Sequence, residues 1–93
     1  MSTKSEFDLD RPWRLDDRVA VRPEPFGALL YHFGTRRLSF LKDPLLLAVV
    51  QGLADHQTAR AACESAGVKA RALPAYQRAL ATLAGSAMIR ARQ

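Results

Sequence analysis

Residues 28–43 read ALLYHFGTRRLSFLKD, and this stretch decides the fold. Two apolar and aromatic runs, residues 27–33 and 36–41, are separated by Gly34 and Thr35. This pattern predicts a β-hairpin with a two-residue turn and glycine in its first position. Asp43 and Pro44 are typical of a helix start, because aspartate caps free N–H groups and proline fits the first helical position. We therefore expect a strand pair that leads directly into a helix.

The predicted turn sets the pairing of the two strands. Tyr31 would face Leu38 and Leu29 would face Phe40, all on one side of the sheet. Because side chains alternate along a strand, we predict that this side faces the core. The opposite side would carry Leu30 facing Ser39 and His32 facing Arg37.

The sequence around the hairpin predicts an α+β fold. Residues 18–22 (RVAVR) alternate between charged and apolar groups, as in a half-buried strand, and prolines then interrupt the run. Helices are predicted over residues 44–54, over residues 58–66 and from Pro74 onward. A three-stranded antiparallel sheet followed by three helices resembles a winged helix-turn-helix arrangement.

The chain is short enough for one domain at 93 residues. We expect a partly ordered N-terminal arm over residues 1–17, with Trp13 packed over an edge of the core, and a single domain over residues 18–93. No signal peptide or membrane-spanning run is evident, and Cys63 is the sole cysteine. These features predict a cytoplasmic protein with no membrane partner.

The net charge of +5 is unevenly distributed. Acids and bases cancel before Gln57, whereas Glu64 is the only acid after it. Such an excess favours an anionic partner, and both nucleic acid and an acidic peptide meet that requirement.

No set of residues indicates catalysis, a metal site or a cofactor. His32 and His56 lie on different predicted elements without a carboxylate or cysteine at ligand spacing. No histidine is placed to activate Cys63, and no glycine-rich phosphate loop is present. The acids of the arm (Asp8, Asp10, Asp16 and Asp17) are expected to be solvated. We therefore predict that the chain is not an enzyme and needs no cofactor.

DNA binding by a winged helix-turn-helix is the alternative. The third helix would enter the major groove, but its outer face offers only Gln77 and Arg78 for base contacts. A generic adaptor between two proteins is a third possibility. Peptide binding is the hypothesis that the predicted elements favour, since an exposed strand edge at residues 36–41 can accept an added strand.

Three segments resemble a known family: FDLDRPWRL, VAVRPEPFGALLYHFGTRRLSFL and DHQTARAACESAGV. They are similar to the small peptide chaperones of mycofactocin biosynthesis, which in turn resemble PqqD-type recognition domains for ribosomally made precursor peptides. The resemblance extends from Phe7 to about Ile89 and is weakest over residues 70–93.

The resemblance implies a non-catalytic role. It implies that the chain binds the leader of a precursor peptide (MftA-like) and delivers it to a radical S-adenosylmethionine enzyme (MftC-like), with no nucleic acid partner. The family fold implies that the leader adds as a strand beside residues 36–41, in a cleft against the third helix. The cleft residues expected here are Arg36, Arg37, Leu38, Ser39, Phe40, Leu41, Arg71, Ala75, Arg78 and Thr82.

Overall fold

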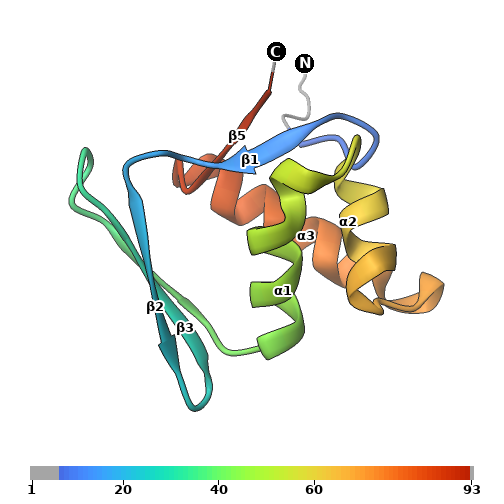
Figure 1. The fold of residues 1–93 in the computed structure, drawn as a ribbon, viewed down its shortest axis with the longest axis horizontal. Helices are drawn as coiled ribbons and strands as arrows, with labels where there is room; N and C mark the ends of the chain where they lie inside the picture. The colour runs from blue at the N-terminus through green and yellow to red at the C-terminus, as the bar shows by residue number, and fades with distance from the viewer. Residues whose placement is uncertain (1–6, 93) are drawn as a thin grey trace.

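The structure is a computed structural model and describes residues 7–92. It contains a three-stranded antiparallel sheet, three α-helices and a separate two-stranded ladder (Figure 1). The elements are β1 (Trp13–Leu15), β2 (Val19–Glu24), β3 (Gly27–His32), β4 (Leu38–Leu41), α1 (Pro44–Gly52), α2 (Ala59–Ala66), α3 (Leu73–Gly85) and β5 (Ile89–Ala91), with short 3-10 turns at Leu53–Asp55 and Ala70–Ala72. The sheet has the order β2-β3-β4, and β1 pairs with β5. The predicted α+β class is confirmed.

The helix ends follow local chemistry. Asp43 Oδ1 accepts a hydrogen bond from the Leu45 backbone N–H at 2.9 Å, and Pro44 opens α1, as predicted. Thr58 caps α2 in the same way. Gly67 ends α2 with φ of 101°, a left-handed conformation in which glycine has no Cβ to clash. α1 is shorter than predicted, because a 3-10 turn replaces its last residues.

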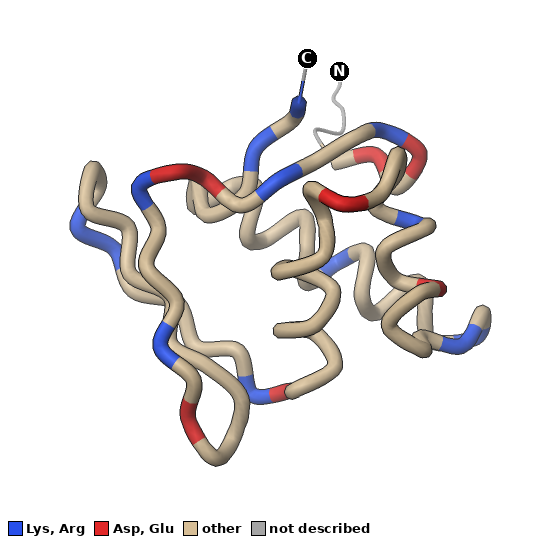
Figure 2. The backbone as a smooth tube through the Cα atoms, viewed as in Figure 1, with Lys and Arg blue, Asp and Glu red and all other residues tan. Residues whose placement is uncertain are grey.

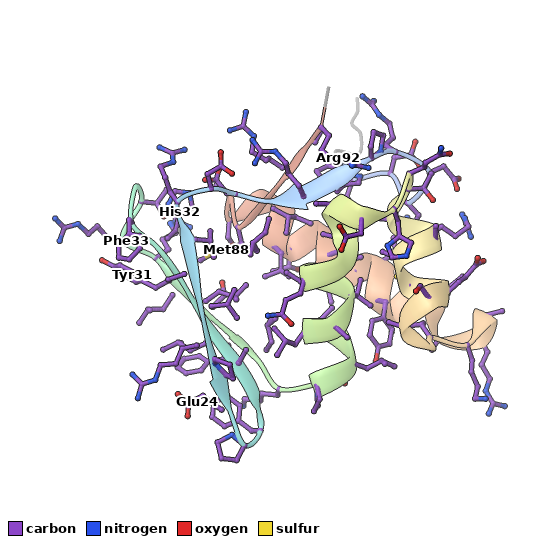
Figure 3. The ribbon with its side chains drawn as sticks, viewed as in Figure 1. Glu24, Tyr31, His32, Phe33, Met88 and Arg92 are labelled. Carbon is purple, nitrogen blue, oxygen red and sulfur yellow. The ribbon has the colours of Figure 1, made fainter. Side chains whose placement is uncertain are left out.

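The predicted strand register is confirmed, but the predicted core face is wrong. Tyr31 pairs with Leu38 and Leu29 with Phe40, yet Leu38 and Phe40 are 55% and 61% exposed. The buried face is the opposite one, where Leu30 has no exposed surface. Both faces of the hairpin are rich in apolar residues, so the alternation alone could not select the face that the helices cover. Figure 3 shows that Tyr31 points away from the helices.

The predicted two-residue turn is also wrong. The backbone N–H of His32 donates to Arg37 O at 3.0 Å, and the N–H of Arg36 donates to His32 O at 2.7 Å, which closes a four-residue loop. Arg36, rather than Gly34, takes the left-handed conformation, with φ of 66°. The side chain of His32 stabilises the loop, because its Nδ1 accepts hydrogen bonds from the N–H groups of Gly34 at 2.9 Å and Thr35 at 3.0 Å. His32 is therefore a buried structural residue.

Both ends of the described chain meet on one side of the helices. β1 and β5 form an antiparallel ladder that the sequence pattern did not predict. Trp13 is buried, as predicted, and its ring lies 4.5 Å from that of Phe7 between centroids. The division of the chain at residue 17 stays a prediction, and residues 1–6 of the expected arm lie outside the described part.

One acid of the expected arm is not solvated. Asp16 is 5% exposed, and its Oδ1 accepts a hydrogen bond from the Arg18 backbone N–H at 2.8 Å. This hydrogen bond lowers the pKa of the Asp16 carboxyl, against the effect of burial. The same oxygen lies 3.8 Å from His32 Nε2. Asp16 therefore belongs to the polar group that fixes the start of β2 and the end of β3.

Candidate functional site

The backbone of β4 presents unpaired groups at the edge of the sheet. Arg37 O accepts a hydrogen bond from the His32 N–H, so the backbone polar groups of Arg37 point toward β3. Since these groups alternate in direction along an antiparallel strand, those of Leu38 and Phe40 point outward. No hydrogen bond among residues 7–92 occupies them. This edge can accept a further strand.

The opposite edge of the sheet, at β2, offers fewer free backbone N–H groups. Phe33 N–H donates to Arg18 O at 2.8 Å, so by the same alternation Val19, Val21 and Pro23 face outward from β2. The N–H of Val19 donates to Asp16 O at 3.0 Å, and Pro23 has no N–H to offer. Within residues 7–92, Val21 is left with an outward N–H that has no partner, whereas β4 offers two such groups, at Leu38 and Phe40, so β4 is the better edge for strand addition.

A groove of about 350 Å³ lies between β4 and α3. Its apolar lining includes Leu41, Leu46 and Leu83, which are 2%, 9% and 4% exposed. Ser39 and Thr82 add a hydroxyl group from each side. A smaller hollow of about 120 Å³ adjoins it, since Leu46 and Ala79 line both. The groove thus runs beside the unpaired edge and offers an apolar surface to side chains of an added strand.

The predicted cleft residues divide into three groups. Four of them line the groove: Ser39, Phe40, Leu41 and Thr82. Ala75 lines the adjoining hollow. The remaining predicted residues are exposed and line neither space: Arg36, Arg37, Leu38, Arg71 and Arg78.

The exposed cations lie at different distances from the groove. Arg78 lies one helical turn before Thr82, whose hydroxyl donates to Arg78 O at 3.1 Å. Arg71 lies in the 3-10 turn before α3, at the end of the molecule opposite the sheet (Figure 1). Figure 2 shows the basic pair at the tip of the β3–β4 hairpin. No ion pair among residues 7–92 involves Arg36, Arg37 or Arg78, so their charge is uncompensated.

The sequence pattern missed three groove residues, Leu46, Ala79 and Leu83. Ala79 and Leu83 are four residues apart and so share one face of α3. That spacing was visible in the sequence, but an alanine and a leucine four residues apart are equally typical of a helix core.

Tyr76 joins α3 to the start of α1 at the hollow that adjoins the groove. Its hydroxyl donates to Asp43 Oδ2, while Asp43 Oδ1 caps α1. The hydrogen bond to this carboxylate, together with burial, raises the pKa of Tyr76 to about 12. The Tyr76–Asp43 hydrogen bond therefore fixes α3 to the start of α1 next to the groove.

Replacing Tyr76 with phenylalanine should lower the free energy of unfolding by about 1.5–3 kcal/mol, the usual contribution of a hydrogen bond to a charged group. Folding raises the pKa of Tyr76. The stabilisation by this hydrogen bond is therefore complete below the pKa of tyrosine in the unfolded chain, about 10, and is lost as the pH rises through about 12. Urea unfolding of the wild type and Tyr76→Phe at pH 8 and at pH 11.5 checks this. The difference between the two proteins should shrink at the higher pH, and a constant difference would contradict the assigned hydrogen bond.

The remaining reactive groups have structural surroundings. Cys63 is buried in α2, and burial raises the pKa of its thiol, which disfavours the nucleophilic thiolate. No cluster of three or more potential metal ligands occurs within residues 7–92. None of the helices in the same range has the length and apolarity needed to cross a membrane.

Comparison with known proteins gives one consistent answer. A family model described as the peptide chaperone MftB family matches residues 12–90. "Peptide chaperone MftB" of Mycobacterium tuberculosis is 63% identical over 89 residues, which cover 96% of this chain and 82% of the relative. The proteins of the same name from Mycobacterium ulcerans and Mycolicibacterium smegmatis are 63% and 57% identical over 83 residues, covering 89% of this chain and 76% and 81% of the relatives. No solved structure matches significantly, so the winged helix-turn-helix likeness stays a prediction.

Proposed function

The chain belongs to the peptide chaperone MftB family, and we propose that it binds the leader of a ribosomally made precursor peptide and presents it to a radical S-adenosylmethionine enzyme. A peptide-binding chaperone role agrees with the name of its relatives. In this proposal the chain itself is non-catalytic and acts in the cytoplasm. The precursor is MftA-like and the enzyme MftC-like.

One observation carries the proposed binding mode, namely that the unpaired edge of β4 runs along the groove. An extended leader would pair its backbone with Leu38 and Phe40 and so become the fourth strand of the sheet. Alternate side chains of the leader would then enter the groove between β4 and α3. The backbone bonds supply affinity for any extended chain, and the groove selects the side chains.

The energy balance favours an apolar and acidic leader. Ordering a flexible segment costs about 2–5 kcal/mol of the gross interaction energy. Burial against Leu41, Leu46 and Leu83 can offset this cost at roughly 25 cal/mol per Å² of apolar surface. Attraction to Arg37 and Arg78 adds mainly to the association rate and weakens as salt is added.

Presentation follows from tethering. A leader held on β4 leaves the rest of the precursor free to extend from the chaperone. If the chaperone also contacts the enzyme, the modified end of the precursor is held near the active site at an effective concentration of about millimolar. The chaperone thus accelerates modification without providing any chemical group.

Reversing the charge of Arg37 and Arg78 together should weaken leader binding by about tenfold at low salt, because both cations are exposed and unpaired near the groove. Calorimetric titration of the Arg37→Glu/Arg78→Glu variant with a synthetic precursor peptide measures this, and the loss should diminish at high salt.

Lys69→Glu is the matched control, since it changes an exposed cation in the loop between α2 and α3. It should bind the peptide nearly as the wild type does. Arg71→Glu in the same loop decides whether that predicted residue takes part. Equal affinity of the double variant and the wild type would remove electrostatic attraction from the proposal.

A further inference from the structure

The side of the sheet that faces away from the helices is unusually apolar. We call it the outer sheet face and define it by Phe26, Leu29, Tyr31, Phe33, Leu38 and Phe40. Four of these side chains are exposed: Phe26 by 44%, Phe33 by 62%, Leu38 by 55% and Phe40 by 61%. In Figure 3 Tyr31 and Phe33 project from the hairpin away from the helices, whereas Met88 lies between the sheet and α3.

These side chains form a contiguous surface with a cationic margin. The rings of Phe26 and Phe40 lie 6.4 Å apart between centroids, and those of Tyr31 and Phe33 lie 5.0 Å apart. Phe26, Phe40 and Lys42 line a hollow of about 420 Å³. Isolated exposed apolar residues are common, but a contiguous aromatic patch on a small protein marks an interaction surface.

We propose that the outer sheet face docks the modifying enzyme, through an apolar surface of that enzyme edged by carboxylates. This inference rests on the proposed function, which supplies the need for such a partner. Lys42 and Arg36 border the face, and no ion pair among residues 7–92 neutralises either of them. Docking of a second copy of this chain would bring these cations together, whereas an acidic partner would compensate them.

The position of the face relative to the peptide edge supports this assignment. Both surfaces border β4, since Leu38 and Phe40 turn their side chains to the outer face and their backbone groups to the edge. A leader added to β4 would extend the outer face by one strand. The docked enzyme would then meet the chaperone and every second side chain of the leader on one continuous surface, so it would bind the loaded chaperone more tightly than the empty one.

The Phe26→Ser/Phe33→Ser variant tests the assignment. Both residues lie in turns, are exposed and do not line the groove, so the fold and the peptide site should be retained. With the radical S-adenosylmethionine enzyme immobilised, the variant should bind about tenfold or more weakly than the wild type, as expected for loss of aromatic anchors. Its affinity for the synthetic precursor peptide should be unchanged. Lys42→Glu should also weaken enzyme binding, and more strongly at low salt.

Several outcomes would overturn the assignment. Equal affinity of wild type and variant for the enzyme would do so directly. A wild-type dimer that the double variant loses in sedimentation analysis would assign the face to self-association. Co-sedimentation with phosphatidylglycerol vesicles, lost in the variant, would assign it to a membrane surface. If the wild type binds the enzyme but ignores the precursor peptide, the proposed function fails, and the comparison of the two proteins on the enzyme still decides the docking surface.

Discussion

The Phe40→Pro variant is expected to stay folded and to lose binding of the precursor peptide by about a hundredfold or more. The Phe40 N–H points away from β3, so proline removes no hydrogen bond of the folded chain. It does remove a donor to the added strand and places a ring in the path of the leader. An unsatisfied partner costs about 1–3 kcal/mol, and the steric conflict adds to it. Calorimetric titration with the synthetic precursor peptide measures the loss.

Two controls separate the backbone effect from others. Phe40→Val removes the aromatic ring but keeps the N–H, so it should retain most of the affinity. Ser39→Pro changes the neighbouring residue, whose N–H faces Leu30 across the ladder. That variant should lose thermal stability, because a buried ladder bond is broken. Normal peptide binding by folded Phe40→Pro would show that the leader uses another surface.

Features of this fold that depend on neighbouring residues could be predicted from the sequence. Asp43 and Pro44 start α1, Thr58 caps α2, and Gly67 ends it, each through hydrogen bonds or backbone conformations within a few residues. The strand register was also predictable, because the short loop after His32 restricts which residues can pair. These choices are made by local chemistry and are little affected by the rest of the chain.

The choice of the buried sheet face was not local. Ala28, Leu29, Leu30 and Tyr31 form a run that is apolar on both faces, so either face could have met the helices. His32 lies on the face opposite the one that was predicted to meet the core. In the folded chain two backbone N–H groups of the hairpin loop satisfy Nδ1, and the ring is buried without exposed surface. The large aromatic side chains consequently remain on the outer sheet face.

The β1–β5 ladder escaped prediction for a different reason. Its strands come from opposite ends of the chain and are only three residues long, which is too short to show an alternation of apolar and polar side chains. Arg92 then stabilises this end of the molecule, since its guanidinium donates to the carbonyl oxygens of Ala54, at 2.9 Å, and His56.

For the candidate site, the strand half of the groove was predictable from the edge position of β4. The helix half depended on how α3 packs, which the sequence pattern did not specify.

Gly27→Ala is expected to destabilise the fold by about 3 kcal/mol or more, through backbone strain and a steric clash. Gly27 has φ of 148°, a conformation that side chains rarely allow. An added Cβ would lie 2.0 Å from Leu41 O and 3.1 Å from the Asp43 backbone nitrogen. Both contacts are backbone atoms at the junction of β4 and α1, so neither can move aside without displacing an element. Thermal and urea unfolding should show a large drop in midpoint.

Gly85→Ala provides the matched comparison, because it makes the same chemical change at the last residue of α3. Nothing lies within 4 Å of the Cβ that it would add, and the backbone there is not left-handed. Alanine should therefore stabilise the helix by about 0.5–1 kcal/mol. Since Gly27 packs directly on Leu41, whose side chain lines the groove, Gly27→Ala should weaken peptide binding even at temperatures where the variant remains folded. Wild-type stability of Gly27→Ala would contradict the close packing of β3 on the end of β4, and with it the rigid edge on which strand addition depends.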